Sequence, residues 1–469
     1  MIVRLLRDSA IYLVPTVLAR GIGLLLLPVY TRYLAPGDYG VLEMLGALYA
    51  LLNLVLPLEV SQAVARFSYE SDRPAARSSS LSTAFWFTCL VFSAWAVVSF
   101  AAPGALSRLL FHQEYVSTIV RLAGIAFLFN ALLYLALNQL RINMQSVHYA
   151  IVSTLFGSVS AAVSVTMVVW LRHGVVGVIY GQLAGSICGL LAAVAFLSTT
   201  SPIRLFFSRS ELGTLARFST PLVASSLAVY ASQYADRWIV SGWNGMGGVG
   251  VYGVALRIAG VITLFTGSVQ LALTPLIYRH YREPGTPVAV ERLFRYYLLA
   301  MFLTILVLAS FSSEIIGLLV GARFQNAAPL VGPVLLTALF MGVNVFAPGL
   351  ALARRTPFIA MANILGAAVN VTLCLLMVPR FGVPGAAWSA VGGAAVAMGL
   401  RFTWSQKHYI IVRRWGRYVG ALGVLAVALG SQLGGAVLGG QRVSLVVITV
   451  ALLTLILIDR PTRGFAGNG

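Results

Sequence analysis

Long apolar runs separated by short polar segments dominate the chain from end to end. Fourteen runs are long enough to cross a bilayer, because a helix of about 20 apolar residues spans its hydrocarbon core. The predicted spans are 9–33, 39–64, 81–102, 116–138, 149–171, 175–198, 216–241, 250–277, 294–319, 330–352, 357–378, 384–404, 418–437 and 443–459. The pattern therefore predicts an all-α polytopic membrane protein, and its first apolar run is expected to be a span rather than a signal peptide.

The composition excludes a soluble or disordered chain. Hydrophobic residues make up 59% of the sequence and charged residues only 10%, whereas soluble domains carry about 25% charged residues. The three cysteines lie far apart inside apolar runs, so they are expected to behave as small hydrophobic residues. We predict no disulfide and no metal site.

The basic residues predict the orientation in the membrane. Sorted by loop, twenty-two of the 32 fall on the side of the N-terminus and six on the opposite side. Cytoplasmic loops are rich in Arg and Lys, so both termini are expected to face the cytoplasm. A net charge of +19 alone would also fit a nucleic-acid-binding protein. Because the charges punctuate apolar spans, no nucleic-acid partner is predicted.

An internal repeat relates the two halves of the chain. Tyr39–Val41 after the first span corresponds to Tyr252–Val254 after the seventh, 213 residues later, and Arg141 and Arg354 differ by the same offset. HGVVG after the fifth span matches FGVPG after the eleventh at an offset of 208. A six-span unit keeps both copies in one orientation, with a cavity expected between them. The predicted organisation is an N-lobe of residues 1–205, a C-lobe of 206–406 and two additional spans in 407–469.

Four arginines lie within or at the edge of predicted spans, namely Arg20, Arg121, Arg237 and Arg257. A charge near the bilayer midplane costs at least about 2.5 to 3.5 kcal/mol, so it usually faces a wet cavity or a partner. Arg20 lies near the middle of the first span, too deep to snorkel easily. We expect it to face a cavity; the alternative is a buried arginine bonded to backbone carbonyls or to an acid.

Only three acids lie in predicted spans, Glu43, Glu59 and Asp236. Asp236 is expected to meet Arg257 rather than Arg237, since adjacent helical residues point about 100° apart. Either an ion-coupling role or a structural ion pair fits Asp236 and Glu59. Arg66, seven residues after Glu59, is expected to share its helical face.

The excess of arginine over acid within the spans favours an anionic cargo. Arginine binds phosphate with a planar fork of donors and stays charged at any relevant pH. A phosphate or pyrophosphate headgroup therefore fits better than a cationic drug. The candidate substrate-binding cations are Arg20, Arg66, Arg141, Arg237 and Arg257.

Four stretches carry a resemblance to a known family: ARGIGLLLLPVYTRYLAPGDYGVLEML, LEVSQAVARF, RFSTPLVASSLAVYASQYADRWIVSGWNGMGGVGVYGVALRI and NILGAAVNVTLCLLMVPRFGVPGAAWSA. They resemble the polysaccharide transporter branch of the multidrug/oligosaccharidyl-lipid/polysaccharide exporter superfamily, which includes oligosaccharide repeat-unit flippases. The third, fourth, ninth, thirteenth and fourteenth spans match that family only in hydropathy.

The resemblance implies two six-helix lobes around a cationic central cavity, working by alternating access. Its implied cargo is an undecaprenyl-pyrophosphate-linked oligosaccharide, moved across a bacterial inner membrane for lipopolysaccharide or exopolysaccharide synthesis. It implies coupling to a proton or sodium gradient and no cofactor. The expected partners are the lipid-linked oligosaccharide, membrane lipids, a polysaccharide polymerase and a chain-length regulator.

Two other functions remain open from the sequence. A cation-coupled drug exporter of the same superfamily would be expected to carry an acid deep in its first lobe, but the first span has none after Asp8. A membrane polymerase or ligase would be expected to have a long external loop with reactive residues. The longest predicted one, near 103–115, offers only His112 and Glu114, so we expect a transporter and not an enzyme.

Overall fold

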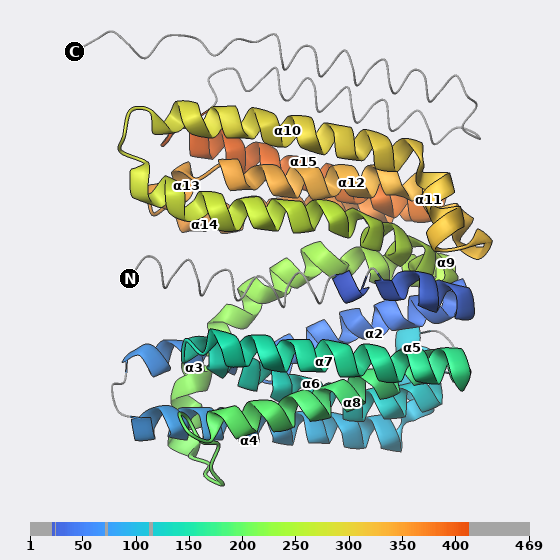
Figure 1. Ribbon diagram of the computed structural model, residues 1–469, viewed down its shortest axis with the longest axis vertical. Helices are drawn as coiled ribbons and strands as arrows, with labels where there is room; N and C mark the ends of the chain where they lie inside the picture. Colours follow the sequence, from blue (N-terminus) through green and yellow to red (C-terminus); the bar gives the residue numbers. More distant parts are fainter. Residues whose placement is uncertain (1–20, 24, 71–73, 112–115, 412–469) are drawn as a thin grey trace. The chain divides into compact units, whose positions relative to one another are not determined.

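The computed structural model describes residues 21–23, 25–70, 74–111 and 116–411 of the 469-residue chain (Figure 1). These residues form helices and no strand, which confirms the all-α class. Among them, ten helices are long and apolar enough to cross a membrane, with α9 counted once although it covers two predicted spans. Most of the first predicted span, including Arg20, and the two spans after residue 411 lie outside the described residues.

The chain forms two compact units. Unit 1 holds the described residues up to Tyr230 together with Asn244–Gly250, and unit 2 holds Ala231–Trp243 and the described residues from Val251 onward. The predicted lobe boundary at 205/206 falls between helices, whereas the units of the structure change over inside α9.

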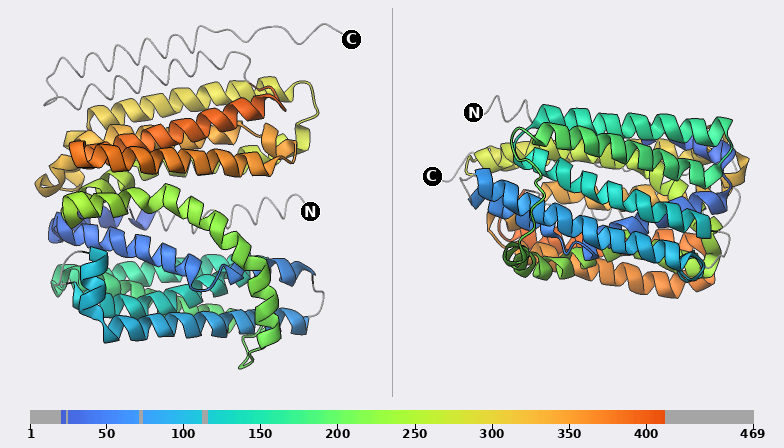
Figure 2. Two further views of the ribbon diagram at one scale, coloured as in Figure 1. Left: turned by 180° about the vertical axis from the view of Figure 1, so that it is seen from behind. Right: turned by 90° about the horizontal axis from the view of Figure 1, so that it is seen from below.

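Unit 1 is a bundle in which α4, α6, α7 and α8 lie side by side (Figures 1 and 2). Close approach between α7 and α8 depends on glycine, because a Cβ at Gly181 would lie 2.6 Å from the carbonyl oxygen of Ser160. Its helices are α2 (Pro36–Val55), α3 (Val60–Glu70), α4 (Pro74–Ala101), α5 (Pro103–Phe111), α6 (Ser117–Ile142), α7 (Ser146–Val165, continued by a π-helical turn Thr166–Trp170) and α8 (Gly174–Leu197).

Unit 2 contains a second bundle, in which α14 packs closely along α15. A Cβ at Gly393 would lie 2.6 Å from the Gly366 carbonyl oxygen. Its helices are α10 (Thr286–Ser310), α11 (Ser312–Leu319), a 3-10 turn Ala322–Ala327, α12 (Ala328–Val343), a 3-10 turn Asn344–Phe346, α13 (Gly349–Leu352), α14 (Thr356–Phe381) and α15 (Val383–Gln406).

The two bundles repeat the same order of helices, which confirms the duplication seen in the sequence. Helix α5 begins at Pro103 and α11 at Ser312, 209 residues later, while α7 and α14 begin 210 residues apart. A short helix thus follows α4 in one copy and α10 in the other. Hydropathy alone merged α10 and α11 into a single predicted span, 294–319.

Helix α9 (Arg209–His280) is 72 residues long and combines the predicted spans 216–241 and 250–277. Its two parts meet at Gly245, where φ is 65° and ψ is −175°. Glycine adopts this conformation without steric cost. The helical path is therefore broken inside the glycine-rich segment, between the two predicted spans, although helical turns extend up to Gly245 from both sides.

Two predicted spans are interrupted. The span predicted over 39–64 divides into α2 and α3 around Pro57, which has no backbone N–H to continue a helix. Leu58 and Glu59 both take left-handed conformations there, with φ values of 52° and 55°. The span predicted over 330–352 is broken in the same way before Pro348. Hydropathy measures apolarity and not backbone geometry, so neither break was predicted.

The segment 198–208 between α8 and α9 is bound along the start of α4. The Ser78 hydroxyl donates to the Pro202 carbonyl oxygen at 2.5 Å. The Arg204 amide donates to the Ser82 hydroxyl at 2.9 Å. This connection is therefore an anchored part of unit 1.

Candidate functional site

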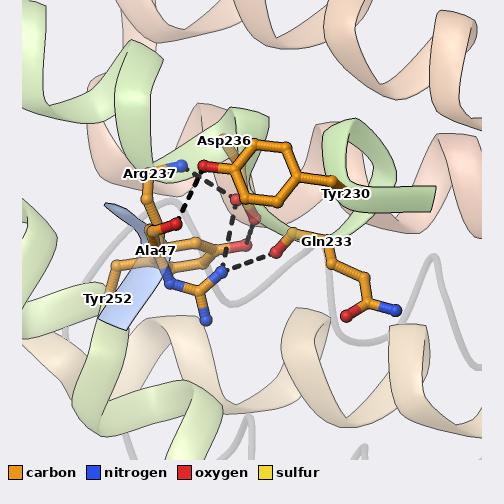
Figure 3. Close-up of polar contacts among 6 residues, drawn as sticks. All are labelled: Ala47, Tyr230, Gln233, Asp236, Arg237 and Tyr252. Carbon is orange, nitrogen blue, oxygen red and sulfur yellow. Dashed lines mark hydrogen bonds and ion pairs between the residues drawn. The ribbon is translucent and has the colours of Figure 1, made fainter. Parts of the chain in front are cut away.

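The carboxylate of Asp236 lies at the centre of a buried polar network in unit 2 (Figure 3). Tyr252 donates its hydroxyl proton to Asp236 Oδ2 at 2.7 Å. Arg237 donates its backbone N–H to Asp236 Oδ1 at 2.8 Å, and its Nη1 lies 3.6 Å from the same oxygen. The carboxylate and guanidinium side chains are only 7% and 13% exposed. A buried carboxylate thus has both a neutral donor and a cation beside it.

The side chain of Arg237 explains why the expected pairing of Asp236 with Arg257 is not found. Its guanidinium turns back along α9, donating to the Gln233 carbonyl oxygen at 2.6 Å and lying 4.9 Å above the Tyr234 ring. Adjacent helical residues point about 100° apart, but the arginine side chain is long and flexible enough to bring its guanidinium near the neighbouring carboxylate. Arg257 lies exposed farther along α9.

Helix α14 places Cys374 near this network and carries a second buried polar side chain, Asn370, one turn away. Cys374 is fully buried and lies near Asp236. Asn370, one turn earlier on α14, is 5% exposed, and its Oδ1 has no hydrogen-bond partner among the described residues. Carboxylate and amide oxygens suit a proton or a hard cation. Over the described ranges, no three His, Cys, Asp or Glu residues gather as a metal site.

A second polar cluster lies in unit 1, around Tyr134 on α6. The Tyr134 hydroxyl lies near the side chains of Ser61, Glu59 and Arg141. Arg141 donates from Nη2 to the side-chain oxygen of Asn138. Glu59, in the interruption between α2 and α3, therefore lies near Tyr134 on α6. The Tyr134 side chain remains 43% exposed.

Arg66 on α3 has a different environment. Its guanidinium carbon lies 4.5 Å from the centre of the Phe218 ring at the start of α9, a cation–π contact within unit 1. The expectation that Glu59 and Arg66 share a helical face is wrong, because Glu59 lies outside α3 in a left-handed conformation.

The structure thus groups the candidate residues in two places. It pairs Asp236 with Arg237 in unit 2, and it places Glu59 and Arg141 each near Tyr134 in unit 1. Sequence reasoning missed the role of Tyr252 in the first group. Its position in the repeated Tyr-Gly-Val motif was the signal that could have identified it.

A duplicated bundle of long apolar helices with buried charged side chains is the architecture of a secondary transporter. A family model described as polysaccharide biosynthesis protein matches residues 29–329, more than half of the chain. The protein therefore belongs to the polysaccharide biosynthesis protein family. An uncharacterized membrane protein of Methanocaldococcus jannaschii, MJ1068, is 22% identical over 220 residues, which cover 45% of this chain and 43% of that protein.

Solved structures share the fold. The lipid II flippase MurJ, in an inward closed conformation, has a TM-score of 0.73 at 14% identity, covering 95% of this chain and 97% of that one. A multidrug resistance MATE family transporter of the MOP superfamily, in an inward-facing conformation, has a TM-score of 0.65 at 16% identity, covering 88% and 99%. A MOP superfamily transporter from Pyrococcus furiosus has a TM-score of 0.54 at 16% identity, covering 90% and 96%. These findings confirm the resemblance to this superfamily.

Proposed function

We propose that the protein is a flippase for undecaprenyl-pyrophosphate-linked oligosaccharide repeat units. It moves them from the cytoplasmic to the periplasmic leaflet by alternating access, for synthesis of a surface polysaccharide such as lipopolysaccharide or exopolysaccharide. The observation that carries this proposal is the family match over residues 29–329. The fold shared with a lipid II flippase supports it further.

Exposed cations within unit 1 fit the pyrophosphate headgroup. Arg66 and Arg141 are both exposed, and each is oriented by a contact with a neighbouring side chain. The half-exposed ring of Tyr134 beside Arg141 offers an apolar face for a sugar. Arg20, Arg237 and Arg257 complete the proposed set of substrate-binding cations.

Asp236 is proposed as the residue that couples transport to a proton or sodium gradient. Its burial and its bond to Tyr252 support this role. Asp236→Asn should abolish gradient-driven transport in vesicles while leaving exchange without a gradient. Asp38→Asn is the control, since Asp38 only accepts from the Ala35 amide at the start of α2. Loss of both activities in Asp236→Asn would contradict a coupling role.

The multi-pass protein is proposed to lie in the bacterial inner membrane with both termini in the cytoplasm. No cofactor is required for this mechanism. A polysaccharide polymerase and a chain-length regulator are its proposed partners, because they would act on the exported repeat units.

Deletion of the gene tests the function directly. Surface polysaccharide should be lost and lipid-linked repeat units should accumulate in the cytoplasmic leaflet, with recovery when the wild-type gene is restored. Normal polysaccharide export in a deletion strain without a second flippase would contradict the proposal.

The second candidate is a cation-coupled small-molecule exporter, favoured by the fold shared with a MATE transporter. It predicts that the deletion strain becomes sensitive to cationic drugs and keeps its polysaccharide. Measuring drug sensitivity and surface polysaccharide in the same strain separates the two functions.

A further inference from the structure

Two glycines within unit 1 allow the start of α2 to contact the backbone of α9. A Cβ at Gly40 would lie 2.7 Å from the carbonyl carbon of Met246, and closer still to its oxygen. A Cβ at Gly250 would lie 2.9 Å from the carbonyl carbon of Pro36, and again closer to its oxygen. Neither position can therefore hold a side chain unless the backbones separate.

The contact is reciprocal, and we call its four residues, Pro36, Gly40, Met246 and Gly250, the glycine clasp. Each glycine packs against the carbonyl that lies four residues before the other glycine. Neighbouring Gly37 and Gly247 would have open space around an added Cβ. The need for glycine is thus confined to the clasp, although the surrounding segments are rich in glycine.

The clasp holds a short insertion from the other half of the chain. Asn244–Gly250 belongs to unit 1, whereas the residues directly before and after it belong to unit 2. Two residues beyond Gly250, the Tyr252 side chain is 1% exposed and donates to Asp236 in unit 2. The turn of α9 that contains Gly250 and Tyr252 is therefore bound on one side by Gly40 and Pro36 of unit 1 and on the other by Asp236 of unit 2.

The clasp suits a contact that opens and closes. It joins the two backbones through carbonyl oxygens that face glycine Cα atoms. Each such Cα–H···O contact contributes only about 0.5–1 kcal/mol. Asn244–Gly250 is continuous with unit 2 at both ends, and its backbone is already non-helical at Gly245. Separation of this segment from α2 therefore breaks the weak contacts of the clasp without breaking a regular helix.

We propose that the glycine clasp is a releasable closure of the transport cycle, and that the Tyr252–Asp236 hydrogen bond sets how firmly it is held. This inference rests on the alternating access proposed above. When Asp236 binds a proton or a cation, its hydrogen bond with Tyr252 is lost. The turn that carries Gly250 is then held only by its contact with α2. Ion binding in unit 2 is thereby communicated to a contact in unit 1.

The state of the clasp can be measured with a cysteine at Val249, which is fully buried beside Gly250. Purified full-length protein carrying Val249→Cys is placed in nanodiscs and labelled with a soluble maleimide. Protein without this substitution gives the background from the native cysteines. The labelling rate should rise about tenfold with Gly40→Ala or Gly250→Ala. It should stay unchanged with Gly37→Ala or Gly247→Ala.

The link to Asp236 is tested with the same reporter. Tyr252→Phe and Asp236→Asn should each raise the labelling rate at least threefold. Ser241→Ala is the matched control, because that buried hydroxyl bonds only to the Trp238 carbonyl oxygen within α9. An unchanged rate in Tyr252→Phe would overturn the link.

The clasp proposal is overturned if Val249→Cys is labelled at the same rate in the Gly40→Ala and Gly250→Ala variants as in the Gly37→Ala variant. If the two clasp variants fail to reach the membrane, Tyr252→Phe decides the proposal, since it leaves both glycines intact. The assay contains no substrate. A deletion strain with normal polysaccharide would therefore disprove the flippase function without affecting the labelling result. Unchanged labelling in the variants would disprove the clasp without affecting the flippase function.

Discussion

At the scale of single residues, the arrangement around Asp236 shows how a charge is accommodated inside a membrane helix. Tyr252 and Arg237 both lie against the carboxylate, and the ring of Tyr234 covers the guanidinium. Removing one partner of a buried ion pair typically costs about 3–5 kcal/mol, because the remaining charge stays buried. The network should therefore contribute to stability as well as to coupling.

Arg237→Ala should lower the thermal stability of the purified protein by several degrees, and Arg237→Lys by less. Lysine keeps the charge but loses the planar contact with Tyr234. Unfolding can be followed with a thiol-reactive dye, because Cys374 is buried in the folded state. Arg380→Ala is the control, as Arg380 is exposed at the end of α14. Equal effects at positions 237 and 380 would show that the buried pair contributes nothing.

Sequence reasoning identified the charged members of this site but not their partners. Asp236 and Arg237 stood out because charges are costly in an apolar span. The bond to Tyr252 joins residues 16 positions apart across the bend at Gly245. A helical wheel assumes one straight helix, so it could not show that bond.

At the scale of elements, the interruption between α2 and α3 is the clearest departure from a regular span. Leu58 and Glu59 are both left-handed, a conformation that costs a residue with a side chain roughly 1–2 kcal/mol. Glycine avoids this cost at such a position. In a regular helix, glycine instead costs about 1 kcal/mol relative to alanine.

Glu59→Gly and Gln62→Gly should therefore change stability in opposite directions. Glu59→Gly relieves the left-handed conformation and should raise the unfolding temperature. Gln62→Gly, on an exposed position of α3, should lower it. Thermal unfolding in detergent measures both, and a large loss of stability in Glu59→Gly would show that its carboxylate is structurally essential.

Packing between α14 and α15 gives a second expectation for an element. Gly393→Ala would place a Cβ 2.6 Å from the Asn370 Cβ, and such overpacking typically costs about 1–3 kcal/mol. The unfolding temperature should fall. Gly399→Ala on the same helix meets open space and should be neutral. Similar unfolding temperatures for the Gly393→Ala and Gly399→Ala variants would contradict the close packing of these helices.

The sequence predicted which segments are helical, because apolar length is a direct property of residues such as those of α6 and α8. It did not predict where the helices break, since Pro57 and Pro348 lie inside runs whose average hydropathy stays high enough for a span. The short helices α5 and α11 were also missed, because nine or fewer residues leave little periodic signal.

At the scale of the whole molecule, the duplication and the charge bias together determine the expected topology. Each bundle repeats the other's order of helices, so equivalent loops should lie on the same side of the membrane. The basic residues then predict that 198–208 is cytoplasmic and that the α7–α8 loop is external.

Single cysteines introduced at His173 and Leu205 test this topology, since both positions are exposed. In intact cells, an impermeant maleimide should label His173→Cys. It should label Leu205→Cys only after the membrane is opened. Cells expressing the protein without either substitution provide the background. Labelling of both sites in intact cells would overturn the proposed orientation.

The placement of Asn244–Gly250 in unit 1 also bears on biogenesis. A fragment ending at residue 205 lacks Asn244–Gly250, the segment that packs against Gly40. Unit 1 of such a fragment would therefore be incomplete. The first half of the protein can be completed only after Gly250 has been synthesised. Splitting the gene at its apparent midpoint should therefore give two polypeptides that accumulate only when co-expressed, although each contains one of the two predicted six-span units.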